Sequence, residues 1–269
     1  MGYQIHVLYF SATGTTEKVV LKIAEKLSAK MNGATINRVD FTLPQARETP
    51  CSFGKNDLVI AGVPVYAGRV PNVLLKYLQS IRGNGALAAA VVLYGNRDYD
   101  DALIELRDLL TQDGFRVVAG GAFIGEHSFS RVLAKGRPDE NDLAYADQLA
   151  ELIEDRIKTE KFDEVQVKGH SPYRPYYRPK DPQKRPVDIR KVKPKTSEKC
   201  IRCLTCVNVC PMGSISADDP SLFTGICIKC GACVKKCPVG AKYYDDQDYL
   251  RHKTELEAEL TERKEPELF

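Results

Sequence analysis

The sequence has no tryptophan and no long apolar run. Any aromatic stacking on a ligand must therefore come from its 13 tyrosines or 9 phenylalanines. The longest apolar stretch, residues 87–94, is far shorter than the roughly 20 residues that a membrane-spanning helix needs. No signal peptide is recognisable, so we expect a cytoplasmic protein with reduced thiols and no membrane insertion.

Several motifs of common enzyme classes are also missing. The sequence has no G-x-G-x-x-G fingerprint, no Walker loop, no Ser-His-Asp set and no cysteine in a nucleophile motif. No catalytic residue is therefore assigned from the sequence. A length of 269 residues with 43% hydrophobic residues is enough for two domains with a substantial core.

Cysteine is abundant, and eight of the nine cysteines form two copies of one pattern. Each copy reads C-x2-C-x2-C-x3-C-P, and the copies are 27 residues apart. This is the bacterial ferredoxin spacing for two 4Fe–4S clusters, in which the fourth cysteine of each run ligates the other cluster. One predicted metal site consists of Cys200, Cys203, Cys206 and Cys237, and the other of Cys227, Cys230, Cys233 and Cys210.

Zinc and disulfides are weaker alternatives for these cysteines. Structural zinc sites usually show paired C-x2-C units with a spacer between them, and disulfides do not persist in the cytosol. The ninth cysteine, Cys51, lies far from both runs and is predicted to be an ordinary loop or core thiol.

The N-terminal half alternates strand and helix patterns. Strands are predicted at residues 5–10, 35–41, 58–63, 87–94 and 115–124. Helices are predicted to begin near Thr16, Pro71 and Tyr99 and after an N-cap at Asp139. This alternation predicts an α/β fold with a doubly wound parallel sheet of five strands.

The loop after the first predicted strand has the composition of a phosphate site. Small hydroxyl residues surround one glycine at a helix N-terminus, where backbone N–H groups and the helix dipole favour an anion. No lysine or arginine lies in the loop, which suits binding by neutral groups. The candidate residues are Ser11, Thr13, Gly14, Thr15 and Thr16.

Two further loops are expected beside this one. If the strand order is 2-1-3-4-5, ligands bind at the carboxyl ends of the first and third strands. The loops after the third and fourth strands would then hold a planar ring, with Tyr66 and Tyr99 as candidates for stacking. Their alternatives are a surface turn residue and a packing residue at a helix start. The candidate residues are Pro64, Val65, Tyr66, Ala67, Gly68, Gly95, Asn96, Arg97, Asp98 and Tyr99.

Together, these motifs resemble the flavodoxin–ferredoxin fusion proteins found chiefly in anaerobic bacteria and archaea. The loop of residues 11–16 is similar to the flavodoxin phosphate loop, and residues 192–245 are similar to two-cluster ferredoxins. The resemblance implies a flavodoxin-like fold with FMN, and a small α+β ferredoxin domain with two 4Fe–4S clusters. The lack of tryptophan excludes the tryptophan stack that some flavodoxins place on the flavin.

Composition suggests the domain limits. We expect an FMN domain at residues 1–158, a linker at 159–191, a ferredoxin domain at 192–247 and a charged tail at 248–269. Residues 168–199 contain 11 Lys and Arg against 3 Asp and Glu, with six prolines. A strap over the domain seam or a docking face for an acidic redox partner fits this segment better than nucleic-acid binding.

The expected function is electron transfer between FMN and the two clusters, which would link a two-electron partner to a one-electron partner. The partners would be redox proteins such as a ferredoxin or a flavoenzyme. The alternative is an enzyme whose clusters feed FMN, which then reduces a small molecule above Tyr66, Tyr99 and His127. A hydrogen-bonded loop histidine is the simpler role for His127. The oligomeric state, including a homodimer, stays open.

Overall fold

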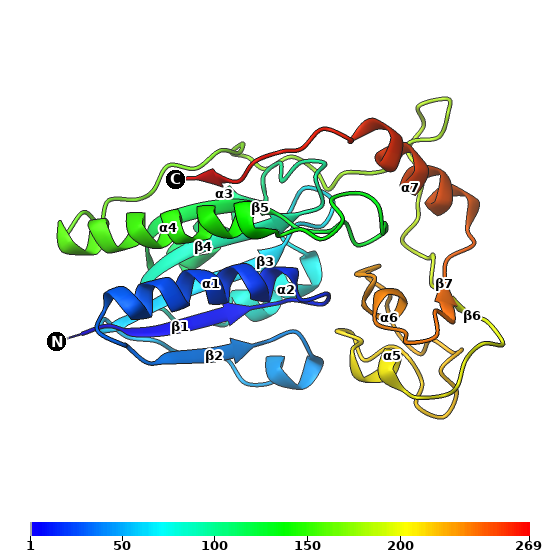
Figure 1. Cartoon of the computed structure of the whole chain (residues 1–269), viewed down its shortest axis with the longest axis horizontal. Helices are drawn as coiled ribbons and strands as arrows, with labels where there is room; N and C mark the ends of the chain where they lie inside the picture. The colour runs from blue at the N-terminus through cyan, green and yellow to red at the C-terminus, as the bar shows by residue number, and fades with distance from the viewer. Residues whose placement is uncertain (1) are drawn as a thin grey trace.

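The computed structural model describes residues 2–269 and divides the chain into an α/β domain and a small cysteine-rich domain (Figure 1). The cysteine-rich domain lies beyond the carboxyl ends of the strands. The elements are β1 (Gln4–Tyr9), α1 (Thr15–Lys30), β2 (Ile36–Asp40), η1 (Pro44–Arg47), β3 (Asp57–Pro64), α2 (Asn72–Leu78), β4 (Leu87–Tyr94), α3 (Ala102–Gln112), β5 (Arg116–Ile124), α4 (Glu140–Lys158), β6 (Lys195–Thr196), α5 (Thr205–Asn208), α6 (Ala232–Lys235), β7 (Lys242–Tyr243), α7 (Gln247–Glu259) and β8 (Glu267–Leu268).

Six strands form the main sheet in the order β2-β1-β3-β4-β5-β8. The first five strands pair in parallel, so the predicted order 2-1-3-4-5 is confirmed. β8 adds an antiparallel edge, in which Leu268 pairs with Gly121 of β5. Nothing in the sequence predicts β8, because two residues are too few to show the alternation of a strand.

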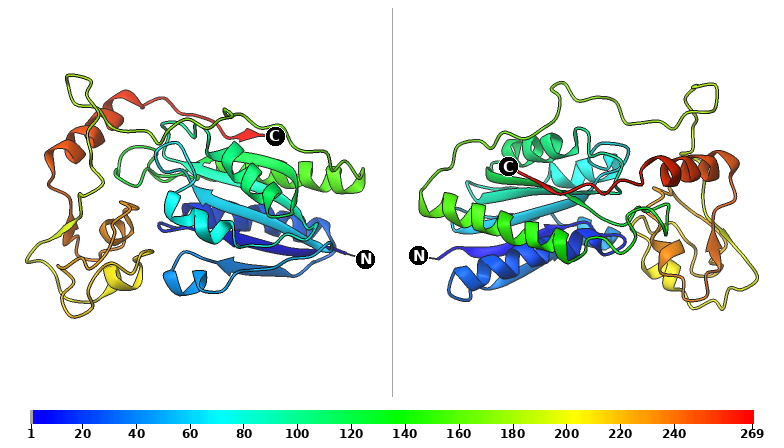
Figure 2. Two further views of the ribbon diagram at one scale, coloured as in Figure 1. Left: turned by 180° about the vertical axis from the view of Figure 1, so that it is seen from behind. Right: turned by 45° about the horizontal axis from the view of Figure 1, so that its top comes forward.

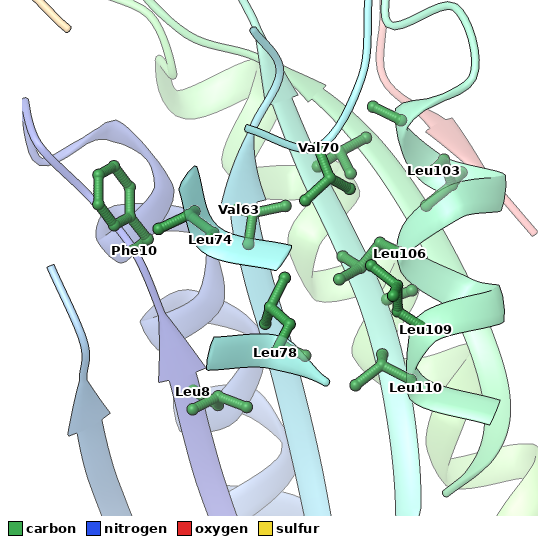
Figure 3. Packing of buried hydrophobic residues seen from close by; sticks show 14 of the residues in the cluster. Leu8, Phe10, Val63, Val70, Leu74, Leu78, Leu103, Leu106, Leu109 and Leu110 are labelled. Carbon is green, nitrogen blue, oxygen red and sulfur yellow. The ribbon is translucent and has the colours of Figure 1, made fainter. Parts of the chain in front are cut away.

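Helices cover both faces of the sheet. α1 and α4 pack on one face, and α2 and α3 pack on the other. Figure 3 shows the second layer, in which Leu74 and Leu78 of α2 and Leu106 of α3 meet side chains of the sheet. Every residue of β4 is buried. Burial on both faces explains why the central strands are nearly continuous apolar runs.

The helix starts follow local signals in the sequence. The Asp139 carboxylate accepts the backbone N–H groups of Asn141 at 3.1 Å and Asp142 at 3.2 Å, so the predicted N-cap of α4 is confirmed. α3 begins at Ala102, later than the predicted Tyr99. Asp100, between them, has a φ of 44°, which an α-helix does not allow.

The strap (residues 159–194) runs along the outside of the α/β domain to the cysteine-rich domain (Figure 2). The Arg69 guanidinium lies 4.6 Å from the Tyr173 ring and 5.1 Å from the Tyr176 ring. The fully buried Asp101 carboxylate accepts the backbone N–H groups of His170 at 3.0 Å and Arg174 at 2.6 Å. The strap tyrosines and basic residues are therefore used to hold it against the α/β domain.

The last residues return to the sheet. After α7, the tail (residues 260–269) crosses back to β5, as the red segment in Figures 1 and 2 shows. The Asn96 amide donates to the backbone oxygens of Leu260 and Glu262, both at 2.9 Å, and the Tyr99 hydroxyl donates to the Glu267 carboxylate at 3.0 Å. Within residues 2–269, no helix has the length and apolar character needed to cross a bilayer.

Candidate functional site between the sheet edge and the cysteine-rich domain

A cavity lies at the carboxyl ends of β1, β3, β4 and β5, where doubly wound sheets bind ligands. It encloses about 470 Å³ of space, part of it open to solvent. Loops of the α/β domain form most of the wall, and Cys230 of the cysteine-rich domain contributes to it. The predicted residues that line the cavity are Thr13, Thr15, Thr16, Pro64, Val65, Tyr66 and Gly95.

The loop of residues 11–16 forms a cradle for an anion at the N-terminus of α1. Gly14 precedes the helix with a φ of 92°, a left-handed conformation that favours glycine. The Thr16 hydroxyl is buried and has no hydrogen-bond partner within residues 2–269. The first N–H groups of a helix also lack intrahelical acceptors, so a bound phosphate would satisfy both kinds of donor.

Ser11 supports this loop from behind. Its hydroxyl accepts the backbone N–H of Glu17 at 3.0 Å, and its own N–H donates to the Thr42 hydroxyl at 2.8 Å. Ser11 does not line the cavity. Its contacts fix the path of the chain from β1 into α1.

Tyr66 begins a tight turn at the end of β3. Its backbone exchanges hydrogen bonds of 3.0 and 3.2 Å with Arg69, while Ala67 and Gly68 have φ angles of 53° and 79°. Burial raises the pKa of the Tyr66 phenol, and the neighbouring Cys230 and Cys227 raise it further. The phenol therefore stays neutral beside both the cavity and the second cysteine run.

In the loop after β4, some residues line the cavity and others contact the tail. Among its predicted residues, Gly95 lines the cavity, whereas Asn96 and Tyr99 bind the tail. Arg97 pairs with Asp100 and lies 4.7 Å from the Tyr177 ring of the strap. The Asp98 carboxylate accepts the backbone N–H of Asp100 at 2.9 Å. The structure thus does not bring residues 96–99 to the cavity wall.

The loop after β5 supplies further wall residues, among them His127, which the sequence suggested only for the enzyme alternative. These residues are Gly125, Glu126, His127 and Ser128. The Nδ1 atom of His127 accepts the backbone N–H of Phe129 at 3.1 Å. Burial lowers the pKa of His127 to about 3, and the Lys235 ammonium lowers it further. The ring is therefore neutral and carries its hydrogen on Nε2. The sequence could place this loop near the cavity only through the strand topology, because β5 ends at the same edge of the sheet as β1, β3 and β4.

Glycine lets this loop approach its neighbours closely. A Cβ atom on Gly95 would lie 2.3 Å from Cδ2 of His127. A Cβ atom on Gly125 would lie 3.0 Å from Cβ of Thr15. Gly95 therefore has no room for a side chain unless His127 moves, and Gly125 has room for one only if Thr15 shifts slightly.

The cysteines surround two further hollows of about 320 Å³ each. The first-run hollow has Cys200, Cys203 and Cys206 with Cys237 of the second run, and the second-run hollow has Cys227, Cys230 and Cys233 with Cys210 of the first run. The structure thus brings together both predicted quartets, each with one cysteine from the other run. Whether the thiolates ligate clusters in this scheme stays a prediction.

The donor set of each quartet fits an iron–sulfur cluster. Among residues 2–269, no three Cys, His, Asp or Glu side chains converge closely enough for a single metal ion. Three cysteines of a C-x2-C-x2-C run with a fourth from the other run line each hollow, which is the donor set of a 4Fe–4S cluster in bacterial ferredoxins. Burial raises the pKa of the Cys230 thiol to about 12, so a cation is needed to keep it as a thiolate.

Cys51 lies apart from both hollows. Its sulfur is 3.2 Å from the Tyr77 hydroxyl, and its side chain packs against the core of the α/β domain. The prediction of an ordinary loop or core thiol is confirmed.

The fold and the two kinds of site define an electron-transfer protein of the flavo-iron–sulfur class. Residues 6–117 match the family model described as a flavodoxin domain, and residues 199–242 match that of a 4Fe-4S dicluster domain. The chain therefore joins a flavodoxin domain to a 4Fe–4S dicluster domain, as flavodoxin–ferredoxin fusion proteins do. The first domain implies FMN, and the second implies 4Fe–4S clusters.

Solved flavodoxins are similar to the first domain. A flavodoxin from the domain Archaea is 16% identical, with a TM-score of 0.41, over 58% of this chain and 99% of its own. Megasphaera elsdenii flavodoxin is 17% identical, with a TM-score of 0.39, over 55% and 97%. A mutant Fusobacterium nucleatum flavodoxin bound to flavin mononucleotide is 19% identical, with a TM-score of 0.39, over 60% and 98%. None of the curated proteins matches the chain.

Proposed function

We propose that this protein passes electrons between FMN in the cavity and two 4Fe–4S clusters in the cysteine quartets, and so links a two-electron partner to a one-electron partner. When bound, FMN exchanges electrons in pairs or singly, and each cluster carries one. The observation that carries the proposal is that Cys230 belongs to both the cavity wall and a cysteine quartet.

The flavodoxin loops supply the proposed FMN contacts. Thr13, Thr15 and Thr16 would donate to the phosphate at the N-terminus of α1, where the Thr16 hydroxyl lacks another partner among the described residues. Pro64, Val65, Tyr66 and Gly95 would lie against the flavin ring. Ser11 and Gly14 would shape the phosphate loop without lining the cavity.

The composition of the cavity wall favours a carrier over an enzyme that reduces a small substrate. Cys230 of the dicluster domain forms part of the wall, next to the loops that would hold FMN. The side of the flavin that faces this wall would therefore meet the domain that exchanges electrons rather than a substrate.

The first test is anaerobic stopped-flow absorbance on protein loaded with FMN and iron. The carrier proposal expects about one FMN and about 8 iron atoms per chain, and flavin reduction by reduced ferredoxin or another redox protein. NADH and NADPH alone should reduce the flavin slowly, because the chain has no dinucleotide fingerprint. Fast bleaching by a pyridine nucleotide without another protein would instead identify the cavity as an enzyme active site.

A further inference from the structure

The two cysteine quartets differ in their position relative to the FMN cavity. Cys230 of the second-run hollow lines the cavity, and no cysteine of the first-run hollow does so within residues 2–269. Cys203 of the first-run hollow is exposed, whereas no cysteine of the second-run quartet is. One quartet thus contacts the cavity, and the other contains the exposed cysteine.

We propose that the quartet Cys210, Cys227, Cys230 and Cys233 holds the near cluster, which alone exchanges electrons directly with FMN, and that the quartet Cys200, Cys203, Cys206 and Cys237 holds the far cluster, which serves an external one-electron carrier protein. This order rests on the proposed function. It assigns Gly231 as the positioning residue that sets the distance between FMN and the near cluster.

Gly231 allows the two domains to touch at backbone distance. It has a φ of 76°, and a Cβ atom there would lie 2.4 Å from the backbone oxygen of Ser128 in the cavity wall. The next residue, Ala232, is fully buried in the apolar cluster of the α2 and α3 face. Cys230, which is 8% exposed, belongs to the same cluster. The loop that carries the near quartet is therefore seated directly on the cavity wall.

Polar contacts lock the same seam. The Lys235 ammonium donates to the Glu126 carboxylate at 2.6 Å and to the backbone oxygen of His127 at 2.7 Å. Arg47 donates to the backbone oxygen of Pro211 at 2.5 Å. The pair of Lys235 and Glu126 is mostly shielded from water, with side-chain exposures of 12% and 25%, so the near quartet is held in one position rather than tethered loosely.

The electron balance is simple in this order. Each electron that leaves reduced FMN reduces the near cluster by one electron, and the protons of the reduced flavin pass to water. The near cluster is reoxidised as the far cluster is reduced, and the far cluster is reoxidised by an external ferredoxin-type protein. Two such passages return FMN to its oxidised form, and the reverse direction uses the same order.

Gly231→Ala and Gly240→Ala form a matched pair for the test. Both positions have positive φ angles, 76° and 63°, but a Cβ atom at Gly240 meets nothing within 4 Å. Both variants therefore carry similar backbone strain, and only Gly231→Ala pushes the near quartet away from the cavity wall.

In loaded protein, the rate of flavin–cluster electron exchange is followed by absorbance after a photoreducing flash, together with the fluorescence of bound FMN. Gly231→Ala should slow the exchange severalfold, because electron tunnelling falls off steeply as the distance between FMN and the near cluster grows. It should also brighten the flavin, because the near cluster that quenches its fluorescence is moved away. FMN and iron contents should be unchanged, and Gly240→Ala should behave like the parent protein. Equal exchange rates in the two variants would overturn the role of Gly231.

Ligand variants test the order itself. Cys203→Ser should keep fast flavin–cluster exchange but lose electron delivery to an external ferredoxin, whereas Cys233→Ser should lose the exchange while retaining FMN. The reverse pattern would refute the order. Failure of the proposed function is distinguishable, because the parent protein would then lack FMN or show no flavin–cluster exchange.

Discussion

Thr16 has one side-chain atom available for ligand binding and another that packs in the fold. Its hydroxyl is buried at the N-terminus of α1 without a partner among the described residues, while its methyl group packs toward Gly62 of β3. A buried hydroxyl without a hydrogen bond costs stability, so a sequence that retains one is expected to use it for a ligand.

Thr16→Val should weaken FMN binding by about 1.5 kcal/mol, or roughly tenfold in Kd, because it removes one donor to a charged group. The protein without FMN should be no less stable, since valine keeps the shape and removes the unsatisfied hydroxyl. Fluorescence titration with FMN and thermal unfolding measure the two effects. Thr111→Val on α3, where the hydroxyl donates to the backbone oxygen of Arg107 at 3.0 Å, is the control. Unchanged FMN affinity in Thr16→Val would remove this hydroxyl from the site.

Among the elements, the two cysteine runs are each incomplete without the other. Each run supplies three cysteines to one hollow and its fourth cysteine to the other hollow. The short helices α5 and α6 follow the second cysteine of each run, and the backbone N–H of Ala241 lies 3.2 Å from the Cys237 sulfur. Exchange of the fourth cysteine brings the two hollows close together.

Cys237→Ser should therefore damage the cluster of the first run, although Cys237 lies in the second run. Iron content should fall toward half, and the electron paramagnetic resonance spectrum of the reduced variant should match that of Cys203→Ser. If it matched that of Cys233→Ser instead, each run would hold its own cluster. Cys51→Ala is the control and should leave the iron content unchanged, because this thiol packs against the α/β core.

The predicted elements of the α/β domain were found because their signals are local. β1 and β4 are apolar runs, and the first turn of α4 contains its own capping box. The loops after β4 and β5 were harder to assign, since a loop residue shows no sign of which neighbour it will face. Tyr99 could have stacked on a ligand, but the tail supplies Glu267 as the partner for its hydroxyl.

At the scale of the whole molecule, the strap and the tail tie the two domains together. The strap binds Asp101 and Arg69, and the tail binds residues 96–99 and the edge of β5. Phe269 exchanges two backbone hydrogen bonds with Gly120 at 2.9 and 3.1 Å. These contacts hold both segments against the α/β domain on their way to and from the dicluster domain.

Removal of residues 261–269 should destabilise the α/β domain by about 3 kcal/mol, because several hydrogen bonds of roughly 1 kcal/mol each are lost. Hydrogen exchange of the β5 amides should speed up accordingly. Tyr99→Phe, which loses the single bond to Glu267, should cost about 1 kcal/mol, and Tyr145→Phe on α4 serves as its control. Protection of β5 that survives truncation would show that the tail adds nothing to the sheet.

Two histidines with lowered pKa values, His127 and the buried His252, make the seam sensitive to acid. Burial lowers the pKa of His127 to about 3 and that of His252 to about 4, both below the ordinary value of 6.5. The Phe129 ring contacts both, with centroids at 5.2 and 6.4 Å. Below pH 6.5, the unfolded chain binds protons that the folded chain does not, so these groups contribute stability that is lost as the pH falls toward 4.

The anaerobic melting temperature should thus be flat near pH 7.5 and fall below pH 6.5, with a loss of up to about 1.4 kcal/mol per pH unit for each histidine. Replacement of both histidines by glutamine should flatten this decline between pH 6.5 and 5.5. An equally steep decline in that variant would assign the acid sensitivity to other groups.

The sequence by itself determined the alternation of strands and helices, the phosphate loop and the cysteine spacing, because each depends on residues within one turn, strand, helix or loop. Which cysteine run faces the cavity was decided only by the tertiary structure, through contacts such as Gly231 with Ser128 and Lys235 with Glu126. Such contacts join residues about a hundred positions apart and depend on the shape of both folded surfaces. Local spacing therefore predicts which groups this protein binds, and long-range packing decides how their sites are arranged.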